Sequence, residues 1–311
     1  MKFKVIKLYF RTPVHIGEVG IGLEETSEIL HSDTIFSAMV NALSYLGEDV
    51  SSFIEKVREG GIKISSAYPF FEEYYFPKPL IPPSFIPPDL RREYGKKIKE
   101  LKFIPKDFFE KWVSQIEVDE NELKELDRAE KKLSNIKKYD LPKVSLDRRT
   151  KDSSIYYIGL LKFKEGGLYF LLDSSDNDYS KFIEPALNIL REEGFGGKRT
   201  WGLGQFEFDV DTISLDVPKA NSYVTLSLVY PENVNSLSYW QFIKRGGWVY
   251  SKHSKVQMRK PKVLLISEAS AFREYEAGIL LDLDEFGGFS AKIGHKVYLN
   301  GKSFLIPAVI T

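Results

Sequence analysis

The sequence predicts an α+β fold of two tandem domains, each an antiparallel sheet backed by helices, with a charged helical insertion in the first. The 311-residue length is close to the point where one hydrophobic core gives way to two. Strand-like and helix-like segments follow one another in the order of a split βαβ unit. A break at residues 216–221 then separates a smaller C-terminal part. We therefore expect domains at 1–217 and 218–311.

The first elements follow from apolar spacing. Residues 2–10 alternate and are rich in Val, Ile, Tyr and Phe, which predicts a half-buried strand. Residues 31–46 place apolar side chains at helical spacing, with Ser32 and Asp33 as candidate N-caps. Two further strands are expected at 62–69 and 74–76, which gives half of a split βαβ unit.

The chain changes character at about residues 77–140, first to a proline-rich stretch and then to charged helical sequence such as NELKELDRAEKKL. We interpret this segment as an insertion on the surface of the first domain. Afterwards the sequence predicts strands at 155–163 and 168–172, a helix at 179–193 and a strand at 205–210.

The second domain is expected to begin at about residue 218. A strand at 223–230, a short helix near 236–244 and strands at 262–267, 278–283 and 296–309 follow in order. Both domains can thus be written as a four-stranded antiparallel sheet backed by helices.

Composition excludes several kinds of site. The absence of cysteine excludes disulfides, thiolate nucleophiles and cysteine-based metal sites. The 44 Lys and Arg balance the 44 Asp and Glu, so any binding of a polyanion must come from local patches. No run of about twenty apolar residues could span a bilayer, and the N-terminus resembles a strand more than a signal peptide. We expect a cytoplasmic protein with no membrane partner and no cofactor.

The most informative stretch is GFGGKRTWGLG at residues 194–204, which has five glycines in eleven residues between a predicted helix and a predicted strand. Glycines let successive backbone N–H groups point into one concavity that binds anions, and Lys198 and Arg199 add positive charge there. The spacing matches neither a P-loop nor a dinucleotide fingerprint. The alternative is a structural helix-to-strand connection with a Schellman-type cap at Gly194.

Two other segments are basic. Lys143, Arg148, Arg149 and Lys151 surround Asp147 and Asp152, which suits phosphate contacts or, alternatively, a solvated turn with local ion pairs. Residues 233–267 contain no Asp or Glu but seven Lys and Arg, interleaved with aromatic residues. That composition favours stacking of unpaired bases, although a merely solubilising basic face would look the same. The aromatic residues are Trp240, Phe242, Trp248 and Tyr250.

These segments resemble a known family. GFGGKRTWGLGQFEF is similar to the glycine-rich loop that follows the last helix of a ferredoxin-like domain in the repeat-associated mysterious proteins (RAMPs) of CRISPR systems. The stretch PVHIGEVGIGLEETSEILHSDTIFSAMVNAL resembles the N-terminus of the Cas-five-like subunit of type III-A (Csm) complexes. VSLDRRT, at residues 144–150, is similar to the V-x-I-D-R-x-T element at the base of the thumb hairpin, which we expect at about 141–155.

The resemblance implies two tandem ferredoxin-like domains and a non-catalytic role. The chain would bind the single-stranded 5′ repeat-derived tag of CRISPR RNA (crRNA) and bridge a Cas-ten-type large subunit to the backbone RAMP subunit. The expected RNA-binding residues lie in the glycine-rich loop, the thumb, the start of the first helix and the basic C-terminal run: His15, Gly17, Ser32, Arg148, Arg149, Gly194, Gly196, Gly197, Lys198, Arg199, Trp201, Lys252 and His253.

The competing hypothesis is a metal-independent endoribonuclease that processes precursor RNA, because a related RAMP branch uses a histidine to activate the 2′-hydroxyl. His15 and His31 are the candidates. The subunit that the sequence resembles is not regarded as the nuclease of its complex, and His31 also suits a helix cap. Four scattered histidines predict no metal site.

Overall fold

The structure, a computed structural model, describes residues 1–18, 22–147, 149–251 and 256–310. No helix within these ranges is long and apolar enough to cross a membrane. The N-terminal sheet has five strands, ordered β2-β8-β1-β9, with β3 also paired to β8 and every pair antiparallel. This is the order of a split βαβ domain. The strands are β1 Lys2–Phe10, β2 Ile62–Ile64, β3 Tyr68–Phe70, β8 Gly167–Ser174 and β9 Phe206–Ser214.

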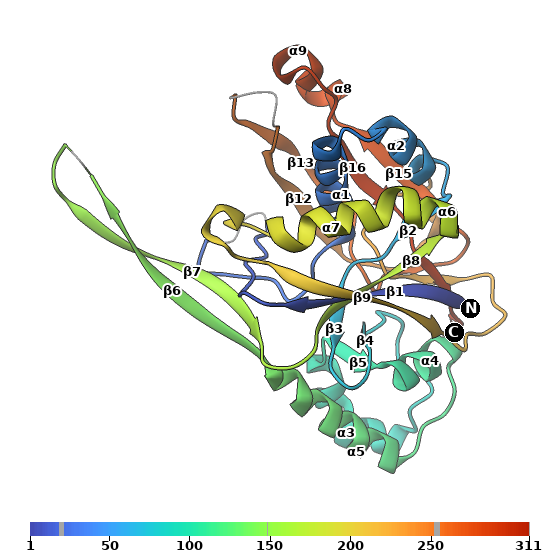
Figure 1. Ribbon diagram of the computed structural model, residues 1–311. Coiled ribbons are helices and arrows are strands. Elements are labelled where there is room, and N and C mark those ends of the chain that lie inside the picture. The colour runs from blue at the N-terminus through green and yellow to red at the C-terminus, as the bar shows by residue number, and fades with distance from the viewer. Residues whose placement is uncertain (19–21, 148, 252–255, 311) are drawn as a thin grey trace.

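Both faces of this sheet are covered. Three helices pack on one face, above the sheet in Figure 1: α1 Ser32–Leu46, α2 Val50–Arg58 and α7 Glu184–Glu193. A three-residue helix, α6 Asp176–Asp178, and a π-helical turn, Tyr179–Ile183, precede α7. Because neighbouring residues point to opposite faces of a strand, burial of both Val5 and Ile6 shows that β1 is not half-buried as predicted. Helix α2 was not predicted.

The insertion covers the second face of the sheet. It begins after β4 Tyr75–Pro77 and contains α3 Pro88–Glu100, β5 Phe103–Pro105, α4 Lys106–Ser114, α5 Glu120–Lys132 and a 3₁₀ turn, Leu133–Asn135. Asp119 and Glu122 form a capping box that starts α5. The Trp112 side chain is buried, and its indole N–H donates to the Ile81 carbonyl at 2.9 Å. The insertion is therefore part of the core, which corrects the prediction of a surface addition.

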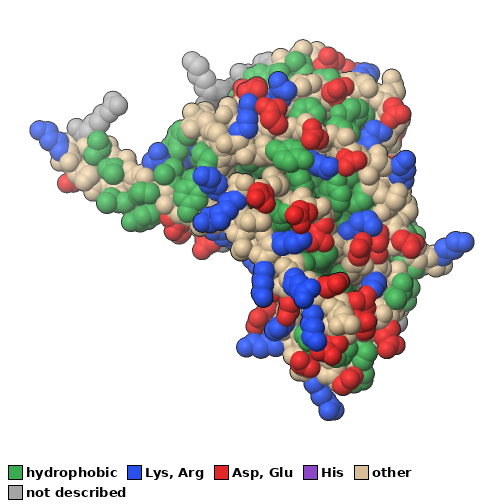
Figure 2. Space-filling model, turned by 60° about the horizontal axis from the view of Figure 1, so that its bottom comes forward, with side chains coloured by type: hydrophobic (Ala, Val, Ile, Leu, Met, Phe, Trp, Pro, Cys, Tyr) green, Lys and Arg blue, Asp and Glu red, His purple; other side chains and the backbone are tan. Residues whose placement is uncertain are grey.

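A long two-stranded hairpin projects from the body (Figure 1), formed by β6 Ile136–Leu146 and β7 Ser153–Phe163. The register runs without a break from Ile136 opposite Phe163 to Leu146 opposite Ser153. The hairpin is thus longer than the predicted thumb, and VSLDRRT lies at its tip and not at its base. Figure 2 shows apolar side chains along the hairpin, and Val144, Leu146, Ile155 and Tyr157 are 51–71% exposed.

The C-terminal part contains a four-stranded antiparallel sheet ordered β11-β14-β10-β17 and two further hairpins. Residues 236–244, predicted as a helix, instead end a 3₁₀ turn and form β11 and the start of β12, where they pair with β14 and β13. The elements are β10 Tyr223–Thr225, β11 Leu237–Tyr239, β12 Phe242–Val249, β13 Met258–Ile266, β14 Ala271–Phe272, β15 Gly278–Asp282, α8 Asp284–Gly287, α9 Phe289–Ile293, β16 Tyr298–Lys302 and β17 Leu305–Pro307.

One apolar cluster joins the N-terminal sheet to the C-terminal part. Phe3 of β1 packs against Phe304, with ring centroids 5.0 Å apart, and Val224 and Ile306 belong to the same cluster. The second face of the first sheet therefore buries residues from both sides of position 217.

Candidate nucleic-acid interface

The glycine-rich loop connects α7 to β9, and most of its glycine amides are already bonded within the fold. Gly194 N–H donates to Leu190 O at 2.7 Å, Gly197 N–H to His15 O at 2.8 Å and Gly204 N–H to Pro13 O at 2.9 Å. Gly202 N–H donates to Arg199 O at 2.8 Å as well, so the prediction that the loop glycines offer bare amides to an anion is wrong for four of the five. Gly194, at φ 84° and ψ 161°, also lies outside the left-handed helical region of a Schellman cap.

Close packing of backbone explains the glycines instead. A β-carbon at Gly196 would overlap the carbonyl oxygen of His15, and one at Gly204 would overlap that of Phe195. The loop therefore lies directly against residues 13–15. Its glycines fix the position of the side chains that project from it, and these side chains are the part of the loop that a ligand could reach.

Trp201 is the main projecting side chain. It ends a 3₁₀ turn, Arg199–Trp201, and is 44% exposed. The Lys198 ammonium lies 4.9 Å from its ring centroid, and the Lys143 ammonium of β6 lies 5.0 Å from it. Cations over an indole face are favourable contacts. The indole thus contacts one lysine from the loop and one from the hairpin.

Tyr250, directly after β12, supplies a second exposed ring. The Arg199 guanidinium carbon lies 5.5 Å from its ring centroid. Its hydroxyl is hydrogen-bonded to that of Tyr45 on α1, and this bond, helped by burial, raises the pKa of Tyr45 to about 12. We call Lys143, Lys198, Arg199, Trp201 and Tyr250 the aromatic–cation strip. It combines rings that can stack on bases with cations that can contact phosphates.

His15 joins three segments below this strip. Its ring is 5% exposed, and Nδ1 donates to Gly159 O of β7 at 2.8 Å. Its own carbonyl accepts from Gly197, and its Nε2 lies beneath exposed Gly17. His15 therefore positions the loop against the hairpin and presents little surface of its own.

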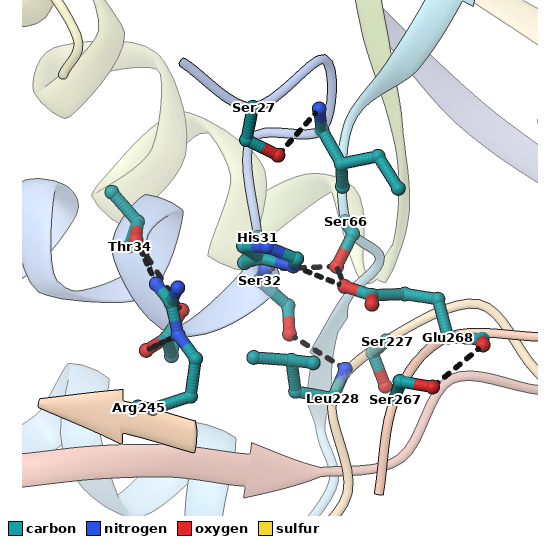
Figure 3. A network of polar contacts seen from close by, with 12 residues as sticks. Ser27, His31, Ser32, Thr34, Ser66, Ser227, Leu228, Arg245, Ser267 and Glu268 are labelled. Carbon is teal, nitrogen blue, oxygen red and sulfur yellow. Dashed lines mark hydrogen bonds and ion pairs between the residues drawn. The ribbon is translucent and has the colours of Figure 1, made fainter. Parts of the chain in front are cut away.

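Ser32 offers no surface to a ligand, which corrects the prediction that it lines the groove. It is fully buried, its N–H donates to Ser66 Oγ at 2.9 Å, and its hydroxyl accepts from Leu228 N–H at 3.1 Å. The N-cap of α1 is His31, without a side-chain cap. The Asp33 carboxylate instead accepts two hydrogen bonds from Arg245, each 2.9 Å (Figure 3).

His31 contacts two carboxylates. Nδ1 lies 2.7 Å from Glu268 Oε1 (Figure 3), and Nε2 lies 3.3 Å from Glu18 Oε1. Burial works to lower the pKa of His31, but Glu268 and Glu18 outweigh burial and raise the pKa to about 9. The hydrogen bond to His31 in turn lowers the pKa of Glu18 to about 2. A protonated, 3% exposed imidazole cannot act as a base toward an RNA hydroxyl.

The other predicted residues are spread more widely. Arg149 is exposed in the turn at the hairpin tip, where its N–H donates to the Asp147 carboxylate at 2.7 Å. Lys143 does not join this tip, since its ammonium contacts Trp201. Arg148, Lys252 and His253 lie outside the described residues. In the described part of the chain, no three His, Asp or Glu side chains are grouped as a metal site would require.

Sequence reasoning missed the contacts of Lys143 and Tyr250 and the whole Asp33–Arg245 and His31–Glu268 network. Each of these contacts joins residues that are far apart in the chain. Within the network, the bonded residues are separated by 202 to 237 positions. The only sequence signal was the isolated Glu268 directly after the acid-free run.

A split βαβ sheet, a glycine-rich loop after its last helix and a projecting hairpin define a RAMP protein, and the RAMP superfamily model matches residues 7–207. The model of the CRISPR Csm4 C-terminal domain matches residues 218–308. The chain belongs to the RAMP superfamily and, within it, to the Csm4 family.

Curated relatives agree over nearly the full length. The CRISPR system Cms protein Csm4 of Thermococcus onnurineus is 31% identical over 287 residues, covering 89% of this chain and 91% of that protein. The protein of the same name from Methanocaldococcus jannaschii is 28% identical, covering 99% and 97%.

Solved structures share the fold. A chain in a crystal structure of a Csm1–Csm4 cassette with cA4 superposes with a TM-score of 0.69 at 23% identity, covering 100% of this chain and 99% of that one. A chain of a Csm3–Csm4 subcomplex from a type III-A CRISPR–Cas interference complex gives a TM-score of 0.65 at 22% identity, covering 99% and 100%.

Proposed function

We propose that this chain is a non-catalytic subunit of a type III-A CRISPR effector complex that binds the single-stranded 5′ tag of crRNA. The observation that carries the proposal is the position of Trp201, an exposed indole whose ring is contacted by the ammonium groups of both Lys143 and Lys198. Single-stranded RNA is bound by rings on which bases stack and by cations along its backbone. The strip offers both in a chain whose net charge is zero.

The proposal includes two protein partners. Solved structures that share this fold include Csm4 with Csm1 and Csm4 with Csm3. We infer that this chain likewise bridges a Csm1-type large subunit to a Csm3-type backbone subunit. The exposed apolar hairpin and the charged insertion are candidate docking surfaces.

The histidine-dependent endoribonuclease is not supported by the site. His31 is held in ion pairs with two carboxylates, and His15 is buried against Gly159. We therefore assign the chain a binding role.

The test separates stacking from charge. The assay is an anisotropy titration of a single-stranded RNA at several salt concentrations, and the salt slope is the slope of the logarithm of the binding constant against the logarithm of the salt concentration. Trp201→Ala should weaken binding by about 1–3 kcal/mol, the loss of one stacked base, and should leave the salt slope unchanged. Lys198→Ala with Arg199→Ala should also weaken binding, but should lower the salt slope by about 1.4, because two phosphate contacts are lost.

The chain offers matched controls. Phe286 of α8 is an exposed ring outside both the strip and the basic run, and Arg92 with Lys96 is an exposed cation pair on α3. Phe286→Ala and Arg92→Ala with Lys96→Ala should leave both affinity and slope unchanged. Equal effects of the strip variants and their controls would remove the strip from the RNA site.

A further inference from the structure

A groove lies beside the aromatic–cation strip, where helices α1 and α2 face the end of β12 and residues 294–298. Its volume is about 560 Å³, within the roughly 300–1,000 Å³ of small-molecule sites. Apolar side chains of the two helices line it, among them Val40 and Ile54. Aromatic rings of Tyr45, Trp248 and Tyr250 line it as well.

The groove is continuous with the strip through Tyr250, which belongs to both. Arg199 lies against the Tyr250 ring, and the Tyr250 hydroxyl is bonded to that of Tyr45. Trp248 is 58% exposed and carries the Arg259 guanidinium 4.5 Å from its ring centroid. A strand that crosses the strip therefore meets further rings in the groove and, beside the groove, the cation on Trp248.

Two polar side chains can read the edge of a base there. The Asn41 amide nitrogen donates to Ser37 O at 2.7 Å, and no described residue bonds its amide oxygen. Lys260 lies with Nζ 3.5 Å from Ser37 Oγ, and burial lowers its pKa. An acceptor and a donor within an aromatic-lined groove are the features by which proteins hold unstacked bases.

We infer that this groove holds one nucleoside of the RNA strand that lies on the aromatic–cation strip. The base stacks on the groove rings, and its edge meets Asn41 and Lys260. The inference rests on the proposed function and deepens it, since it assigns one base of the strand to a defined pocket between the two parts of the chain.

The test uses a short single-stranded RNA with 2-aminopurine placed at each position in turn. With the wild-type chain, fluorescence at one position should be quenched by stacking. Val40→Trp fills the groove and should abolish this quenching and weaken RNA binding roughly ten-fold or more, at an unchanged salt slope. Asn41→Ala, which adds no bulk, should reduce the quenching. Asn121→Trp, on the exposed side of α5, is the matched control and should change nothing.

Three outcomes would overturn the inference. Quenching that is the same in Val40→Trp and wild type would place the base elsewhere. If the strip variants still weakened RNA binding in that case, the proposed function would stand although the inference had failed. Quenching of free 2-aminopurine ribonucleotide without quenching in the strand would mean a mononucleotide site. Loss of subunit assembly by Val40→Trp with normal RNA binding would mean that the groove takes a partner's side chain.

Discussion

Gly202 and Gly204 stand two residues apart in the glycine-rich loop, and both adopt positive φ angles, 77° and 80°. Their surroundings differ. Nothing lies within 4 Å of a β-carbon placed on Gly202, whereas one on Gly204 would overlap the backbone of Phe195. The two positions therefore separate the cost of a left-handed conformation from the cost of lost backbone contact.

We expect Gly202→Ala to lower the free energy of unfolding by about 1–2 kcal/mol, the cost of left-handed backbone in a non-glycine residue. Gly204→Ala should cost substantially more, because the loop must also move away from Phe195 and Pro13. Urea denaturation of the two variants measures the difference. Similar losses in both would show that the close approach at Gly204 contributes little.

At the scale of elements, the β6–β7 hairpin contacts the body along its inner half, where Leu161 pairs with Val14 and Gly159 bonds Leu23 and His15. Its outer half exposes Val144, Leu146 and Ile155 to solvent, and the described backbone pairs there only within the hairpin. An isolated two-stranded ribbon gains little from burial. The tip therefore contributes little to the stability of the fold and is available for RNA or a neighbouring subunit.

Replacing residues 145–154 with an Asn-Gly turn should leave the free energy of unfolding unchanged and keep Lys143 beside Trp201. If the tip cations contact RNA as the sequence predicts, the deletion should lower the salt slope of RNA binding. Urea denaturation and salt-dependent anisotropy check both expectations. Marked destabilisation would show that the tip packs on the body, and an unchanged slope would exclude the tip from the RNA path.

The sequence predicted the elements of the N-terminal sheet because their apolar periodicity is local. It could not predict that residues 236–244 form strands, because these strands depend on pairing with β13 and β14 further along the chain. The interruption of the predicted strand 62–69 could not be predicted either, because it depends on contacts with distant residues. Ser65 and Ser66 separate β2 from β3 there, and Ser66 bonds Ser32 and Glu268.

The candidate site was predictable in part for the same reason. Lys198, Arg199 and Trp201 lie together in one loop, so composition identified them. Lys143 lies 58 positions before Trp201, and their contact depends on the hairpin register. The glycines were identified correctly as places of close backbone approach, but the approaching group is the chain's own backbone.

At the scale of the whole molecule, two kinds of contact join the parts on either side of residue 217. The apolar cluster that includes Phe3 and Phe304 lies on one side of the first sheet. The buried pairs Asp33–Arg245 and His31–Glu268 lie at the start of α1. Buried ions are costly unless paired, so separating the two parts would expose both an apolar face and unpaired charges. We expect the chain to unfold in one cooperative transition.

The buried network should make this transition depend on pH. The pKa of His31 is raised from 6.5 to about 9, so its contribution to stability is complete below about pH 6.5 and is lost as pH rises through 9. The contribution of the carboxylates to stability has the opposite pH dependence. Because the pKa of Glu18 falls from 4.5 to about 2, and that of Glu268 is also lowered, their contribution is lost only in acid.

Chemical denaturation at pH 6.5, 7.5 and 9 should therefore show a wild-type free energy of unfolding that falls with rising pH within a single transition. His31→Gln cannot carry the charge, so the variant should be less stable at pH 6.5 and its stability should change much less between pH 6.5 and 9. His295→Gln removes a partly exposed histidine and should keep the wild-type slope. A wild-type stability that does not change over this range would show that His31 is neutral in the fold, and two separate transitions would show that the parts on either side of residue 217 unfold independently.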